Sequence, residues 1–456
     1  RGDVMGVFQV EGQGMRRTLM KMQPRKFEHV IAAISLYRPG PMEYIDDYID
    51  RLHGQKSVAY RHPSLEPILE ETYGIIVYQE QIIRILTDIA GYTPAEADLV
   101  RRAVGKKKKK ALLKHRATFI KGAVEGSEVP RETAKAIFDD IEYFARYGFN
   151  KSHAADYAVL TCQTAYLKAK YPVEYMTDLL TVERSNTDKV SHFIDECRRM
   201  GIEVLPPDIN ESQLLATTDG KQTRMGQLMV KGVRKRGGQE IVEKRQGNGY
   251  LSINDLCRRV NLSIVSSSML AKLAKAGAFD SFGDRREQLW SIKKIHQESR
   301  DNQVCQGQLQ FLPHQSKVQS FTGDIPEMEL REVIDWEIES MGHPITDTPL
   351  SYLMPDSDQL STINQLKDTK EDKVWICGEI TAIRFRWTSQ GKLVCFFTLE
   401  DLESTAEVTV FEPVVSRDKK LLYSKSMILV YARIERKGTI YDLLAEKIVP
   451  LSGERK

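Results

Sequence analysis

The spacing of apolar residues changes once along this chain, near Lys373, and the change separates two kinds of structure. Up to about residue 205 the apolar positions recur at helical spacing, and from about 208 to 290 short helices alternate with turns. From Lys373 the period becomes two, in five short runs: Val374–Ile383, Leu393–Leu399, Glu407–Phe411, Met427–Ile434 and Ile440–Leu444. Five short strands predict a small closed barrel of the oligonucleotide-binding (OB) type. We therefore expect a multidomain α+β protein, mainly α-helical at first and ending in a β-barrel.

Several helix ends can be placed from capping residues. The run Thr93–Glu96 has the form of a capping box with proline in the first turn, and Gly105 marks the end of that helix. A helix over about 153–170 ends before Pro172, because proline cannot continue it. A further helix over about 187–200 has one apolar face, made of Val190, Phe193, Ile194 and Cys197. The region before residue 205 is therefore predicted to be helical up to a short strand at 202–205.

Composition excludes several classes of protein. The 456 residues predict about two to four domains. No apolar run approaches the ~20 residues that span a bilayer, so we expect no membrane association. The six cysteines form no C-x-x-C pair, which argues against structural zinc and disulfides and favours the cytoplasm. The net charge is only +3, so any affinity for nucleic acid must come from local patches. Because the chain begins at Arg1 and not at methionine, we expect a fragment.

Four polar side chains stand where the helix over 153–170 begins. They supply an amide, an ammonium, a hydroxyl and an imidazole: Asn150, Lys151, Ser152 and His153. A helix start has unpaired N–H groups and a partial positive charge, so this segment is predicted to receive an anion such as phosphate. An ordinary capped helix, with Asn150 or Ser152 as the N-cap and Lys151 exposed, is the alternative.

A second basic segment ends the helix that follows Thr93. Arg101 and Arg102 precede a lysine run at 106–110, and guanidinium groups suit a triphosphate because they donate bidentately. By charge alone, however, such a run is typical of a solvated helix face. Arg38 lies in a turn stiffened by two prolines, where it either approaches a phosphate or forms a structural ion pair. Its neighbour Tyr37 either stacks on a base or fills the core.

Long stretches of this sequence resemble the bacterial polymerase III alpha subunits, which are replicative C-family DNA polymerases. The clearest are Ala145–Leu160, Leu36–Met42 and Glu96–Lys107. The resemblance implies a fingers domain at 1–205 that binds an incoming deoxynucleoside triphosphate (dNTP), with Lys108–Lys110 as duplex or solvent contacts. It implies nucleotide-binding roles for Arg38, Arg101, Arg102, Lys106, Lys107, Asn150, Lys151, Ser152 and His153.

The segment Met229–Arg245 looks like a helix-hairpin-helix, within a DNA-binding module predicted at 206–295. The glycine turn of this motif lets backbone N–H groups meet a DNA phosphate. The motif departs from its usual form because Arg234 stands where a second glycine is expected. A dense basic cluster surrounds the turn and is predicted to bind duplex DNA: Lys231, Arg234, Lys235 and Arg236. A purely structural hairpin is the alternative.

Residues 296–345 are predicted to include a linker, since 296–325 lose periodicity and gain glutamine and serine. The stretch Gln306–Leu312 resembles the short peptide by which replication proteins dock on the ring-shaped sliding clamp. Apolar side chains in a polar linker are what a docking peptide requires. Two registers are open: Gln306 with Leu309 and Phe311, or Gln308 with Leu309, Phe311 and Leu312. Packing of the linker on its own domain is the alternative.

The C-terminal OB domain is predicted at 346–456. Three residues near the end of its first strand combine positive charge with an aromatic ring and are predicted to hold single-stranded template: Arg384, Arg386 and Trp387. Alternation sends Phe396 and Phe397 to opposite faces, so at least one of them belongs to the core. Trp375 is expected inside the barrel.

The carboxylates needed for nucleotidyl transfer are not evident in this sequence. Two Mg²⁺ ions held by carboxylates drive that reaction, and the only Asp-x-Asp, Asp356–Asp358, lies in a predicted loop. The resemblance implies that Mg²⁺ is held by a palm domain upstream, so we expect this chain alone to be inactive. The implied partners are primer–template DNA, dNTP, the sliding clamp and other replicase holoenzyme subunits.

A non-enzymatic DNA- and clamp-binding replication module, from a split or truncated gene, is the competing hypothesis. A nuclease is disfavoured because no carboxylate–histidine cluster is evident in the sequence.

Overall fold

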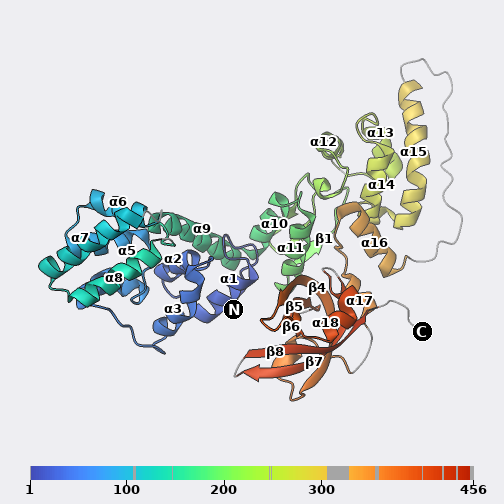
Figure 1. Ribbon diagram of the computed structural model, residues 1–456. Helices are drawn as coiled ribbons and strands as arrows, with labels where there is room; N and C mark the ends of the chain where they lie inside the picture. Colours follow the sequence, from blue (N-terminus) through green and yellow to red (C-terminus); the bar gives the residue numbers. More distant parts are fainter. Residues whose placement is uncertain are drawn as a thin grey trace. The chain divides into compact units, whose positions relative to one another are not determined.

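The computed structural model describes residues 2–105, 109–145, 147–245, 247, 249–305, 328–354, 359–402, 404–423, 426–437 and 440–451. The chain divides into two compact units, Arg1–Pro172 and Val173–Lys456. The first unit is helical, and the second combines helices with a small sheet and a closed barrel (Figure 1).

The first unit has two neighbouring apolar cores. One core lies among the earlier helices and α9, and α2 packs against α9. The other lies among α5 to α8, with Phe119 and Phe138 fully buried. The helices are α1 (Gln13–Met22), α2 (Phe27–Leu36), α3 (Ile45–Leu52), α4 (Glu66–Leu69), α5 (Gln79–Arg84), α6 (Pro94–Gly105), α7 (Lys109–Ser127), α8 (Arg131–Phe144) and α9 (Lys151–Lys170).

Two of these helices, α6 and α9, start at capping residues that the sequence predicts. In the capping box before α6, the N–H of Thr93 donates to Glu96 Oε2 at 2.9 Å, and the N–H of Glu96 donates to Thr93 Oγ1 at 3.4 Å. Of the two candidate caps for α9, Asn150 is the one used, since its Oδ1 accepts the N–H of His153 at 2.8 Å. These helix starts are therefore set by side chains only a few residues away.

The second unit begins with α10 (Pro172–Val182), α11 (Thr187–Arg199) and a three-stranded sheet. Its strands, in the order β1-β3-β2, are β1 (Glu203–Leu205), β2 (Thr217–Thr218) and β3 (Gln222–Arg224). Helix α11 packs against β1, and in α10 the hydroxyl of Thr177 lies 2.7 Å from that of Thr223. The first compact unit ends at Pro172, because α10 and α11 pack on this sheet, while the predicted fingers boundary at 205 stays a prediction.

A group of helices follows the sheet: α12 (Lys235–Lys244), α13 (Ile253–Arg259), α14 (Ser267–Lys275), α15 (Arg285–Cys305) and α16 (Leu330–Met341). Helix α15 continues through residues 296–305, so the prediction of a linker starting at 296 was wrong. Its buried stripe includes His296 and Ser299, and the ring of His296 bonds the carbonyl of Val265 at 3.0 Å. Because these inward residues are polar, the apolar period that predicts a helix is not visible in the sequence.

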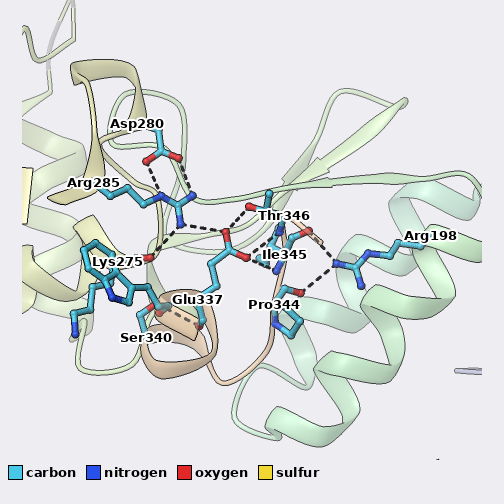
Figure 2. Close-up of polar contacts among 10 residues, drawn as sticks. Arg198, Lys275, Asp280, Arg285, Glu337, Ser340, Pro344, Ile345 and Thr346 are labelled. Carbon is cyan, nitrogen blue, oxygen red and sulfur yellow. Dashed lines mark hydrogen bonds and ion pairs between the residues drawn. The ribbon is translucent and has the colours of Figure 1, made fainter. Parts of the chain in front are cut away.

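A buried carboxylate joins α16 to the chain that leads toward the barrel (Figure 2). Glu337 Oε2 accepts the N–H groups of Ile345 and Thr346 at 2.7 and 2.9 Å, and Oε1 accepts the hydroxyl of Thr346 and a guanidinium N–H of Arg285. Arg285 also donates to both oxygens of Asp280. This Glu337 cluster fixes the path of residues 344–346.

The chain ends in a closed barrel with strand order β4-β5-β6-β8-β7, as the alternating runs predicted. A short helix, α17 (Pro349–Leu353), precedes it, and α18 (Val414–Asp418) lies between β6 and β7. The strands are β4 (Lys373–Trp387), β5 (Leu393–Glu400), β6 (Thr405–Val410), β7 (Met427–Lys437) and β8 (Ile440–Pro450).

The expectation that Trp375 lies inside the barrel was wrong. Its neighbours Val374 and Ile376 occupy the inward positions of β4, so alternation turns Trp375 outward. There it is half-buried, with its ring 5.1 Å from that of Tyr431. Phe397 belongs to the core as expected, whereas Phe396 is only half-buried.

Candidate functional site

The candidate site of the first unit is built around the segment Tyr147–His153, which precedes and starts α9. A short parallel bridge between Tyr78 and Phe149 holds this segment beside the start of α5. In the bridge, the N–H of Phe149 donates to Val77 O at 3.0 Å, and the N–H of Gln79 donates to Phe149 O at 2.9 Å. Residues some seventy positions apart in the sequence are thus held side by side.

Arg38, which lies 109 positions before Tyr147 in the sequence, contacts the same segment. Its Nη2 donates to the carbonyl of Tyr147, its Nε donates to Ser35 O at 3.1 Å, and its guanidinium carbon lies 4.2 Å from the centroid of the Phe149 ring. Gly40, at φ 103°, is required here because a Cβ would come within 2.4 Å of the Tyr147 ring. The turn thus places Arg38 beside Phe149. Tyr37 packs against the core, with its hydroxyl close to Gly14.

The two arginines of α6 share one carboxylate. Arg101 donates to Asp98 Oδ1 through Nε at 3.0 Å and Nη2 at 2.7 Å, while Nη2 of Arg102 lies 2.7 Å from Asp98 Oδ2. Hydrogen bonds from Arg101, with a smaller contribution from Arg102, lower the pKa of Asp98. The Arg101 side chain is 20% exposed and that of Arg102 is 64% exposed. Arg101 is therefore the fixed member of the pair and Arg102 the accessible one.

Two carboxylates already contact the N–H and ammonium groups at the start of α9. Glu80 accepts the N–H of Lys151 at 3.0 and 3.1 Å on its two oxygens, and it accepts the side-chain amide of Asn150 at 3.0 Å. The ammonium of Lys151 lies 2.7 Å from Glu71. Ser152 and His153 are exposed. A phosphate would therefore have to replace carboxylates here, a condition that the basic residues alone did not indicate.

The structure thus brings Arg38 and, through Gln79, Arg101 to the segment that contains Asn150 and Lys151, although these three parts lie far apart in the sequence. Lys106 and Lys107 lie outside the described residues, as does Lys108. Sequence reasoning missed the residues that hold the basic groups: Glu71, Gln79, Glu80 and Asp98. The polar run Gln79-Glu80-Gln81, directly after the buried stretch 75–78, is the signal that points to two of them.

The basic cluster of the second unit lies at the start of α12, where Arg234 is the N-cap residue. Its four members, Lys231, Arg234, Lys235 and Arg236, are all exposed. Gly232, at φ 86°, makes the expected turn, but only a 3-10 turn (Gln227–Met229) precedes it in place of a first helix. A helix start and four cations thus share one surface, which suits a phosphate backbone.

On the barrel, the predicted residues lie together at the exposed end of β4. Trp387 is 72% exposed, and Arg384 and Arg386 are exposed as well. The guanidinium of Arg384 lies 5.1 Å from the ring centroid of Phe396 on β5. Cations and exposed aromatic rings at one strand end are a combination that suits single-stranded nucleic acid, and we call Arg384, Arg386 and Trp387 the barrel platform.

Three other predictions concern ions, the clamp and the membrane. Gln306, Gln308, Leu309, Phe311 and Leu312 lie outside the described residues, as do Asp356 and Asp358. Among the residues that the structure describes, no group of three or more His, Cys, Asp or Glu side chains could hold a metal ion. No helix in the described ranges is long and apolar enough to cross a membrane.

Three family models match this chain in the predicted order. Residues 1–127 match the bacterial DNA polymerase III alpha subunit finger domain, residues 201–289 the helix-hairpin-helix motif, and residues 374–451 the OB-fold nucleic acid binding domain. The DNA polymerase III alpha subunit of Thermus aquaticus is 39% identical over 98% of the chain. The chain is thus similar to DNA polymerase III alpha subunits over nearly its whole length. The last two matched domains are of kinds that bind nucleic acid.

Other DNA polymerase III alpha subunits show the same similarity. That of Halalkalibacterium halodurans is 36% identical over 99% of the chain, and that of Escherichia coli K12 is 36% identical over 95%. The chain covers 38%, 40% and 39% of the lengths of these three relatives, in the order given. It therefore spans about two fifths of the length of these relatives.

Proposed function

We propose that this chain is the part of a replicative DNA polymerase that holds the incoming nucleotide and the DNA, as a C-terminal portion of a polymerase III alpha subunit. The observation that carries the proposal is the approach of Arg38 and, through Gln79, of Arg101 to the segment that leads into Lys151, the first residue of α9. Three cations around a helix start suit a triphosphate, and Arg102 adds an accessible guanidinium beside them. Ser152 and His153 are exposed at the same helix start.

Phosphate binding at this site proceeds by exchange of anions. Asp98 and Glu71 neutralise the side chains that a triphosphate would contact, and Glu80 occupies the first N–H of α9. A triphosphate carries more negative charge than any one of these carboxylates, and its oxygens can accept from several donors at once. The carboxylates therefore keep the cations ordered until a nucleotide arrives.

The second unit holds the DNA. The basic cluster at the start of α12 contacts duplex phosphates, and the platform of Arg384, Arg386 and Trp387 holds single-stranded template. Gln306–Leu312 docks on the sliding clamp, and other replicase subunits assemble with the whole protein in the cytoplasm. In a pull-down on a sliding clamp, replacing Leu309 and Phe311 with alanine is expected to abolish retention; unchanged retention would exclude this peptide.

Two Mg²⁺ ions supply the electrophilic chemistry of nucleotidyl transfer in such a polymerase. The described residues do not fit this role, because they provide no carboxylate cluster. We propose that a palm domain outside this chain holds the metals. The chain alone is expected to be inactive in DNA synthesis.

Primer extension by the purified chain tests the proposal. The reaction contains a primed template, Mg²⁺ and all four dNTPs, and DNA binding is followed in parallel by fluorescence anisotropy. We expect binding without extension. Sustained extension would show that a metal site lies within the 456 residues, and a failure to bind DNA would exclude the DNA-holding role.

The competing hypothesis is a non-enzymatic DNA- and clamp-binding module, and the exposed basic cluster and barrel platform favour it equally. The genomic sequence upstream of Arg1 separates the two. A reading frame that continues with paired aspartates supports the polymerase, whereas a start codon next to Arg1 supports the module.

A further inference from the structure

One side chain connects the two halves of the proposed triphosphate site. Gln79 Nε2 donates to the carbonyl of Gly148 at 2.9 Å, and Gln79 Oε1 accepts a hydrogen bond from Nη1 of Arg101, also at 2.9 Å. Gln79 is half-buried at the first position of α5. Its amide therefore sets the position of Arg101 relative to the backbone that leads into α9.

The turn that carries Gln79 is itself held firmly. Gln81 Oε1 accepts the N–H groups of Val77 and Tyr78 at 2.9 and 3.0 Å, and its Nε2 donates to the hydroxyl of Thr72 at 2.8 Å. Gln81 is 5% exposed, so water competes little for these bonds. The carbonyl of Val77 and the N–H of Gln79 itself are bonded to the backbone of Phe149 in the short bridge. Gln79 thus projects from a rigid base.

The contacts of Arg101 determine how its guanidinium is oriented toward a ligand. A guanidinium has five N–H donors in one plane. Asp98 takes the donors on Nε and Nη2, and Gln79 takes one on Nη1, so these two side chains fix the plane of the group. A phosphate oxygen that approaches the start of α9 meets a guanidinium whose orientation is already set, and less side-chain entropy is lost on binding.

We infer that Gln79 is a positioning residue for the phosphates of the incoming nucleotide, acting through Arg101. This inference rests on the proposed function. Gln79 does not contact the phosphates itself; it holds the Arg101 guanidinium at a fixed place relative to the Gly148–Phe149 backbone. The ligand class is a polyphosphate, recognised by its charge and by its closely spaced oxygens.

The test uses the full chain and inorganic tripolyphosphate, with affinity measured by titration calorimetry at constant salt. Gln79→Met keeps the length of the side chain but loses both hydrogen bonds, and we expect it to weaken binding about tenfold. Arg101→Ala is expected to weaken binding at least as much. In the double variant, Gln79→Met is expected to add no further loss, because its effect passes through Arg101.

A control variant and a second replacement of Gln79 complete the test. Gln163→Met makes the same replacement at an exposed position of α9 and is expected to leave the affinity unchanged. Gln79→Asn keeps the amide on a side chain one methylene shorter, so it cannot reach both partners, and it serves as the second variant if Gln79→Met does not fold. We expect Gln79→Asn to weaken binding as well.

The outcomes separate the two levels of the proposal. If the unmodified chain binds tripolyphosphate and Gln79→Met binds it equally well, the positioning role is excluded while the proposed site stands. Additive losses in the double variant also exclude it, because they assign Gln79 a general structural effect. If the unmodified chain does not bind tripolyphosphate, the triphosphate site itself is excluded, and the positioning role with it.

Discussion

Nη1 of Arg285 lies 3.2 Å from Oε1 of Glu337, a side chain with no exposed surface. This pair joins the first residue of α15 to the middle of α16 (Figure 2). Arg198 of α11 reaches the same region and donates to the carbonyls of Pro344 and Ile345 at 3.3 and 3.0 Å. The Glu337 cluster therefore connects three helices of the second unit to the chain that enters the barrel.

Removing the carboxylate of Glu337 is expected to destabilise the second unit strongly. Glu337→Ala leaves two backbone N–H groups and a hydroxyl without their buried acceptor, at an expected cost of about 3–5 kcal/mol in the free energy of unfolding. Denaturant unfolding followed by tryptophan fluorescence measures it, since Trp290, Trp336, Trp375 and Trp387, the four tryptophans of the chain, all lie in the second unit.

The matched control is Glu339→Ala in the same helix. Glu339 is 59% exposed and pairs with Lys275 at 2.6 Å, so its loss is expected to cost less than about 1 kcal/mol. Equal effects of the two replacements would contradict a special role for the buried cluster.

Neutralising Asp98 is expected to strengthen polyphosphate binding. Asp98→Asn removes a negative charge that lies 2.7 Å from both Arg101 and Arg102, so a phosphate no longer competes with it. We expect a gain of about fivefold in tripolyphosphate affinity, equivalent to about 1 kcal/mol. Asp88→Asn, which removes a carboxylate paired with Arg84 at 3.4 Å, is expected to change nothing. Weaker binding by Asp98→Asn would mean that the orientation that the Asp98 carboxylate gives to Arg101 matters more than the negative charge that it adds to the site.

Trp387 is expected to contribute to the binding of single-stranded DNA. Trp387→Ala removes an indole that is 72% exposed beside Arg386, and loss of one stacked base is expected to cost about 1–3 kcal/mol of binding free energy. Anisotropy with oligo-dT at fixed salt measures this, with duplex DNA expected to bind as before. Trp290→Ala, which removes another exposed indole, on α15, is the control. Equal losses would exclude a specific platform on the barrel.

The contribution of Glu400 to the stability of the second unit is expected to fall as the pH rises between about 4.5 and 7, while His343 of the same unit, whose pKa burial lowers to about 4, contributes in the opposite direction. Burial raises the pKa of Glu400 to about 7, although Arg199, at 3.0 Å, acts in the opposite direction. Asp195, Glu379 and Asp401 raise it further. In this range Glu400 holds a proton in the folded state that it has lost in the unfolded state, so at this group each increase in pH favours unfolding, by up to about 3 kcal/mol in total.

Glu400→Gln is expected to remove this contribution, because the side chain can no longer ionise, so the stability of the variant is expected to rise more steeply with pH than that of the unmodified chain. Urea unfolding at pH 5, 6 and 7, followed by tryptophan fluorescence, measures the slope. Glu435→Gln, an exposed replacement on β7, is expected to keep the slope of the unmodified chain. An unchanged slope in Glu400→Gln would assign the pH dependence to other groups.

The sequence alone predicted those features that depend on near neighbours. The capping box at Thr93 and Glu96, the α9 cap at Asn150 and the five barrel strands are all set within a few residues, so local pattern determines them. The prediction failed where the inward side chains were polar, as at His296 and Ser299 of α15. The prediction also failed at Trp375, which was expected inside the barrel although the alternation along β4 turns it outward.

What only the tertiary structure decided is the arrangement around the candidate site. Arg38, Arg101 and Asn150 were each predicted from the sequence as nucleotide-binding residues, but their proximity depends on the bridge between Tyr78 and Phe149. The carboxylates of Asp98, Glu80 and Glu71 and the amide of Gln79 are ordinary surface residues by sequence. They acquire their role from partners up to eighty positions away. Hydrogen bonds and ion pairs act over a few ångströms of space whatever the separation along the chain, so no local pattern records them.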